Sequence, residues 1–149
     1  MVLPHDVTVI AVTETNGVEE RNATLLHGVL LDSHAVGVIY KSGIQSSDDA
    51  TLYIPKAVEA TDPSSGQAKT YESLDQYLNT PNKADIWTIF ANGKQSGCDC
   101  YIVKGKIDLR EKTDYATLRK NGVEVYRVKS CDYRDYGSKR LHHWQVGLQ

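Results

Sequence analysis

The sequence predicts a mainly β fold: a small β-barrel or curved sandwich with one or two short helices. Short β-branched and apolar stretches recur between turn signals along the chain, and about six to eight such strands are typical of barrels and sandwiches. No alternation of strands with long helices supports a parallel sheet. A chain of 149 residues is ordinarily one domain, so residues 1–149 are expected to share a single core.

The N-terminal part of the chain predicts a long hairpin. Residues 7–14, VTVIAVTE, are β-branched and apolar, and Asn16-Gly17 follows them. Asn-Gly is the strongest short hairpin signal, because both central residues of a type I′ turn need positive φ. Residues 18–31 are therefore expected to return as the second strand.

The middle of the chain predicts short strands. Residues 34–43 are a possible short strand, and 50–58, ATLYIPKAV, form a clearer one. Pro55 cannot donate to a central ladder, so it places the end of this strand at an edge or an exit.

The predicted helices are brief and the predicted loops are polar. Ser73 is a plausible N-cap for a helix over 73–79, and a second helix is expected around 114–120. Three segments are expected to protrude from the domain as loops: 40–50, 59–72 and 132–141.

The C-terminal half predicts further strands and two core anchors. The expected strands are 85–94, 96–107, 123–131 and 142–148. Trp87 and Trp144 lie within two of them and are predicted to pack in the core. Because neighbouring residues of a strand face opposite sides, Trp144 and Val146 should point inward while His143 points outward.

Composition argues against several classes of partner. The net charge of −2 and pI of about 6.2 give no basic footprint, so nucleic acid is a poor first guess for a partner. No apolar run is long enough to span a bilayer, and the N-terminus lacks a secretion signal. The expectation is a protein made in the cytoplasm, with no membrane partner.

Metal or thiol chemistry is the alternative from a different class. Its ligands would come from Cys98, Cys100, Cys131, His142 and His143. The C-x-C spacing is not the usual zinc pattern, and adjacent histidines on a strand point to opposite faces. No nucleophile elbow, P-loop or dinucleotide fingerprint is present either. The sequence therefore predicts no enzyme, no cofactor and no metal, with a small metal-stabilised or thiol-active domain as the alternative.

Several motifs together resemble a known family. They are SDDATLYIP (47–55), YIVKGKI (101–107), LRKNGVEVYRV (118–128), and D-x-R-x-x-G-S (132–138) before HHWQV (142–146). This set resembles small structural proteins of tailed phages and prophages of Gram-positive bacteria, encoded in the head–tail joining region. Residues 93–100, GKQSGCDC, depart from the Gly-Asp turn often found there.

The resemblance implies a head-closure, or stopper, protein of the phage neck. Such a subunit would form a β-barrel, assemble as a six- or twelve-fold ring under the portal and carry no catalytic residues. Its partners would be copies of itself, portal or adaptor proteins, the tail terminator or tail tube, and packaged DNA bound non-specifically in the lumen. It would be found in the virion neck. A tail terminator or another neck component is the alternative.

The predicted interface lies in the loop before the last strand. A charged and aromatic loop there is a plausible contact to a partner surface. Its candidate residues are Asp132, Tyr133, Arg134, Asp135, Tyr136, Lys139 and Arg140.

Overall fold

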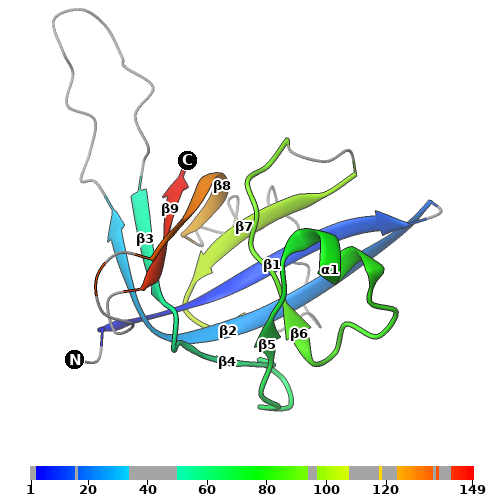
Figure 1. Cartoon of the computed structure of the whole chain (residues 1–149), viewed down its shortest axis with the longest axis horizontal. Helices are drawn as coiled ribbons and strands as arrows, with labels where there is room; N and C mark the ends of the chain where they lie inside the picture. Colours follow the sequence, from blue (N-terminus) through cyan, green and yellow to red (C-terminus); the bar gives the residue numbers. More distant parts are fainter. Residues whose placement is uncertain are drawn as a thin grey trace, which may run out of the picture.

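A computed structural model describes the chain over 3–15, 17–33, 50–93, 97–107, 118, 124–135, 137 and 142–149. Several predicted features lie outside these ranges: the strand at 34–43, the loop at 40–49, the helix at 114–120 apart from Leu118, and the interface residues Tyr136, Lys139 and Arg140. Within the described ranges the fold is mainly β with one short helix, α1 (Figure 1), as predicted.

Nine strands form the described fold. They are β1 His5–Thr15, β2 Val18–Ser33, β3 Ala50–Pro55, β4 Glu59–Thr61, β5 Thr70–Tyr71, β6 Ile86–Trp87, β7 Asp99–Lys104, β8 Val125–Arg134 and β9 His143–Leu148. The helix α1 spans Leu74–Asn79, and no described helix is long and apolar enough to cross a membrane.

The main sheet is antiparallel and closes on itself. Its order is β1-β7-β8-β9-β3-β2-β4, and β1 also pairs with β2. Six strands therefore form a closed circuit, which removes the open edges that flat sheets leave exposed. The predicted mainly β fold, a small barrel or curved sandwich, is confirmed, and Figure 1 shows the sheet curling partly into a ring.

The first two strands form the hairpin that the sequence predicted. They pair from Thr15↔Val18 down to His5↔Val29. The pairing of β2 with β1 ends at Val29, at the base of the hairpin. From Leu30 onward, β2 pairs with β3. Gly28 sits at this point with φ of 78°, a left-handed conformation that glycine adopts without the strain of a Cβ. The glycine lets one long strand turn the corner of the barrel.

A second corner is filled by an asparagine side chain. β8 pairs with β7 only from Val125 to Arg127 and then continues beside β9 across a register shift near Val128. In the gap, the Asn92 amide donates to the carbonyl oxygens of Cys100 (2.8 Å) and Val128 (3.0 Å), and accepts from the Cys100 N–H (2.8 Å). Asn92 thus replaces the strand partner that β7 has lost.

Both faces of β1 are buried, which explains why its sequence does not alternate. Val7 and Val9 face the main core, while Ile10 and Val12 face a second cluster with Leu118. A sheet covered on both sides has near-continuous apolar strands.

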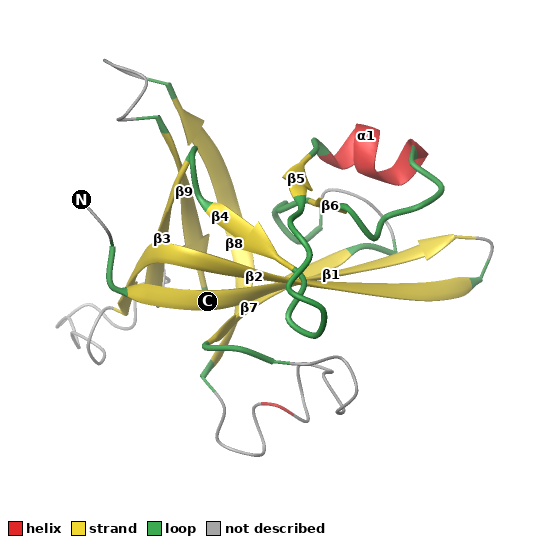
Figure 2. Ribbon diagram, turned by 90° about the horizontal axis from the view of Figure 1, so that it is seen from below, coloured by secondary structure: helices red, strands yellow, loops and turns green. Residues whose placement is uncertain are grey.

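A small layer covers one face of the hairpin. β5 and β6 pair in parallel, and α1 lies beside them over β1 and β2 (Figure 2). Ser73 caps the helix by accepting from the Gln76 N–H, as the sequence predicted, and Tyr77 is buried beneath it.

Several boundaries differ from the prediction, and three of the differences change how a segment is described. The segment 59–72 is not one protruding loop, because β4 pairs with β2 and β5 pairs with β6. The strand expected over 85–94 is only β6, and residues 88–91 continue as a buried segment outside any strand. The loop expected from residue 132 begins later, since β8 runs to Arg134.

Candidate functional site: an aromatic pocket beside the last strand

A pocket of about 680 Å³ opens between the last strands of the barrel and the β5–β6 layer. This volume lies within the range of about 300–1,000 Å³ that is usual for binding clefts. The residues that line the pocket are Lys56, Val58, Lys69, Thr70, Tyr71, Trp87, Tyr133 and Trp144.

The apolar wall of the pocket is a stack of aromatic rings. Trp144 is the centre, with ring centroids 4.7 Å from Tyr71, 5.8 Å from Trp87 and 5.3 Å from Tyr133. Tilted and edge-on geometries at these distances are favourable for aromatic pairs. The two predicted core anchors are both buried, Trp87 at 3% and Trp144 at 6% exposure, so that prediction is confirmed. They also form part of a pocket wall, which the sequence did not indicate.

The last strand orients these rings as its alternation predicted. Trp144, Val146 and Leu148 all belong to the main core. His143 lies on the opposite face, where its ring is 6.1 Å from that of Tyr53. The strand therefore supplies one aromatic wall residue while keeping its histidine outside the pocket.

One lysine of the pocket, Lys69, is held by hydrogen bonds inside the protein. The Lys69 ammonium donates to Asn22 Oδ1 (2.5 Å), the Ala23 carbonyl (2.8 Å) and Thr24 Oγ1 (3.2 Å). Burial lowers the pKa of Lys69, and the carboxylates of Asp62 and Asp85 act in the opposite direction. All three ammonium protons have acceptors on β2, so this side chain anchors the segment before β5 to the hairpin.

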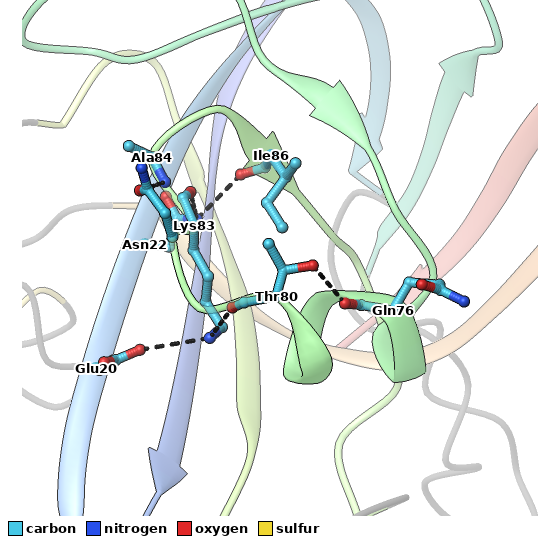
Figure 3. Close-up of polar contacts among 8 residues, drawn as sticks. Glu20, Asn22, Gln76, Thr80, Lys83, Ala84 and Ile86 are labelled. Atoms are coloured by element: carbon cyan, nitrogen blue, oxygen red, sulfur yellow. Dashed lines mark hydrogen bonds and ion pairs between the residues drawn. The ribbon is translucent and has the colours of Figure 1, made fainter.

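Asn22 connects that anchor to the helical layer. Its amide nitrogen donates to the carbonyl oxygens of Lys83 and Ile86, each at 3.1 Å. Lys83 in turn donates to the Thr80 carbonyl (2.8 Å) and lies 3.8 Å from the Glu20 carboxylate. Figure 3 shows these contacts between β2 and the segment after α1. The network fixes the wall from which Trp87 projects.

The other lysine leaves a charge at the surface. Lys56 follows β3 and is exposed, while its backbone N–H donates to the His142 carbonyl at 3.0 Å. That bond holds the residue at the start of the last strand. The pocket therefore combines an aromatic wall with an accessible ammonium group, and it can accept an apolar group that carries negative charge beside it.

The predicted interface residues separate into two groups. Tyr133 lines the pocket and is 42% exposed, and its hydroxyl lies 3.5 Å from His142 Nδ1. Asp132 and Arg134 lie on β8 with a 3.9 Å ion pair between them, and Asp135 is exposed just after the strand. The structure thus places Tyr133 in a site and the neighbouring charges beside it on the strand.

The cysteines lie against the core. Cys98 and Cys100 are buried, Cys131 is partly buried, and no disulfide joins them. Burial raises the pKa of the Cys100 thiol to about 12, so it stays protonated at neutral pH. Within the ranges that the structure describes, no three His, Cys, Asp or Glu side chains are gathered to hold a metal ion.

Sequence reasoning missed Lys56, Lys69 and Tyr71 as pocket residues. The last two belong to a polar, turn-rich segment, 59–72, that reads as a loop. A lysine followed closely by a tyrosine carries no signal of burial, since lysine is almost never buried unless it is paired. Only the fold of this segment against β2 brings them to the last strand.

The chain belongs to DUF6751, a family of unknown function whose profile matches residues 2–149. No curated protein and no solved structure matched the chain. The family match spans both the barrel and the pocket, but its description assigns no activity. The function therefore has to be inferred from the shape and surface of the domain.

Proposed function

We propose that this protein is a structural subunit of a tailed-phage neck, a head-closure protein that forms a ring under the portal. The proposal combines the motif resemblance with a closed β-barrel whose interior is filled by apolar side chains. Such a barrel is a rigid building unit that acts through its surface. Copies of the chain and the neighbouring portal and tail components would be its partners.

The observation that carries the proposal is the placement of exposed apolar side chains. Among the described residues, the exposed large hydrophobic ones are Val18 (61%) and Tyr133 (42%). Val18 is at the end of the β1–β2 hairpin, whereas Tyr133 is on β8 beside the last strand. A ring of identical subunits needs two different, complementary patches on each subunit, and the proposal places their centres at Val18 and Tyr133.

The test is assembly of the purified chain. Native mass spectrometry and analytical ultracentrifugation would measure its mass over a range of concentrations, alone and with purified portal complex. A discrete cyclic oligomer, alone or on the portal, is the expected result. A chain that stays monomeric under all these conditions would contradict the proposal.

The position in the neck needs a separate measurement. A head-closure ring contacts the portal side, whereas a tail terminator caps the tail tube. Electron microscopy of the assembled neck would show which ring each face of the subunit touches. Density for this barrel only on the tail tube would replace the head-closure assignment with the tail-terminator one.

A further inference from the structure

We infer that the end of the β1–β2 hairpin of one copy docks into the aromatic pocket of the next copy. This inference rests on the proposed ring and names the contact that would build it. It would be a heterologous contact, in which one patch meets a different patch on the neighbour.

The hairpin end projects beyond the barrel. β7 pairs with β1 only from Val7 to Val12, while the hairpin continues through Thr13↔Glu20, Glu14↔Glu19 and Thr15↔Val18. Thr13 is still buried and Glu14 lies beside Gly97, so the part of the ribbon that extends past these neighbours is the end at Thr15↔Val18. Figure 1 shows this end of the hairpin reaching away from the β3–β9 side of the molecule.

A subunit cannot place its own hairpin in its own pocket. Leu30 of β2 pairs with Tyr53, Tyr53 pairs with Gln145, and Gln145 pairs with Asp132. The pocket residues Trp144 and Tyr133 are next to Gln145 and Asp132 in the sequence, so this wall of the pocket lies level with the base of β2. Leu30, at that base, is twelve residues along β2 from Val18, or ~40 Å of extended strand. A hairpin end that occupies the pocket would therefore belong to a second copy.

The charges of the two surfaces are complementary. Glu14, Glu19 and Glu20 surround the hairpin end, with Arg21 paired to Glu19 at 2.8 Å. The described lining of the pocket carries the accessible ammonium of Lys56 and no carboxylate, whereas the ammonium of Lys69 is bonded to β2. Complementary potentials of this kind steer two surfaces together and fix their register.

A local cost in the hairpin also points to a cationic neighbour. Glu14 and Glu19 are directly opposite each other across the two strands, and like charges in this position destabilise a sheet. Arg21 offsets one carboxylate of the pair. The Lys56 ammonium of the next copy would offset the other, while Val18, on the opposite face of the ribbon, packs against the exposed ring of Tyr133.

The experiment uses two variants that each damage one side of the contact. Val18→Arg damages the hairpin end, and Lys56→Glu damages the pocket rim; both positions are exposed, so folding should be retained. Gln76→Arg, an exposed position on α1, is the control for added charge. Circular dichroism and thermal unfolding would verify that all three variants fold.

Each damaged variant alone should lose the cyclic oligomer, with the subunit contact weakened at least about tenfold, whereas the α1 control should assemble like the unmodified chain. When the two damaged variants are mixed, the intact hairpin of one can still enter the intact pocket of the other. The mixture should give a 1:1 heterodimer that cannot grow into a ring. Native mass spectrometry with one variant isotopically labelled would identify this species.

The two proposals fail in different ways. If the unmodified chain assembles and both damaged variants assemble equally well, the hairpin–pocket contact is wrong while the ring proposal stands. Rings lost in both variants without any heterodimer on mixing would also contradict the contact. If the unmodified chain never assembles, the proposed function itself fails and the contact fails with it.

Discussion

The corner between β7 and β8 gives the sharpest test of how this barrel closes. Asn92 uses its side chain to pair with both backbone groups of Cys100 and with the Val128 carbonyl. Replacement of Asn92 by Ala leaves the N–H and the carbonyl of Cys100 without those partners. The Val128 carbonyl keeps a bond, because the Asn92 backbone N–H also donates to it at 3.0 Å.

The expected loss of stability follows from the two backbone groups of Cys100 that lose their partners. A buried backbone group without a partner costs about 1–3 kcal/mol, so N92A, which leaves two such groups, should lower the free energy of unfolding by ~2–6 kcal/mol. Urea unfolding followed by the fluorescence of Trp87 and Trp144 measures this change, since both rings are buried in the native state. Asn82→Ala is the matched control: its amide accepts from the Ala84 N–H at 3.1 Å in an exposed turn, and the expected cost is below about 1 kcal/mol.

A second substitution at the same position separates hydrogen bonding from packing. Asn92→Asp keeps an acceptor for the Cys100 N–H but turns a carboxylate toward two carbonyl oxygens. The neutral acid is then favoured in the folded state, which raises its pKa, so the variant should regain stability as the pH falls below its folded pKa. If N92A unfolds at the same urea concentration as N82A, the corner does not depend on this side chain and the account of closure is refuted.

Three further results are expected. Trp144→Ala should cost about 3–5 kcal/mol in urea unfolding, the usual range for truncating a buried Trp, and a cost within error would place the ring outside the core. Lys69→Met should cost about 1–3 kcal/mol, because it leaves buried acceptors on β2 without a donor; equal stability would show that water replaces the ammonium. Burial raises the pKa of Cys100 from 9.0 to about 12, so the unfolded chain ionises first and stability is lost as the pH rises above about 9. At pH 10.5 the wild type should have lost about 2 kcal/mol that Cys100→Ala retains, and parallel pH profiles for the two proteins would contradict this.

Local chemistry allowed much of the barrel to be predicted. The Asn16-Gly17 signal and the flanking apolar residues located the first hairpin, and Ser73 located the start of α1. In each case the determining contacts lie within a few residues of each other in the sequence, so they can be read without knowledge of the fold.

The structure differs from the prediction where contacts between residues far apart in the sequence determine whether a segment forms a strand. Residues 86–91, IWTIFA, read as a strand, but most of this segment lies buried between layers and Asn92 satisfies the neighbouring backbone through its side chain. β8 continues through Arg134 because β9 offers it a ladder, although Asp132 and Asp135 make that stretch look like a loop. Strand preference depends on the neighbouring strand more than on the residue itself.

The pocket was predictable only in part, for the same reason. Trp144 and Tyr133 could be identified because each is a large aromatic residue near the last strand. Lys69 could not, because its burial depends on three acceptors that β2 supplies from more than forty residues earlier in the chain. Sequence reasoning thus singled out three of the four aromatic residues, Trp87, Tyr133 and Trp144, and missed Tyr71 and both lysines.

Protection of the strand edges is a competing explanation for the acidic residues at the hairpin end. The ribbon beyond Val12 has unpaired edges, and charged side chains on such edges prevent unwanted strand addition. A single charge on each edge is sufficient for that role, and Glu20 with its Lys83 partner already supplies one. Edge protection does not require Glu14 and Glu19 to face each other, which costs stability in the isolated subunit. The proposed contact with a cationic pocket rim on a neighbouring copy would account for both the position of these carboxylates and their pairing.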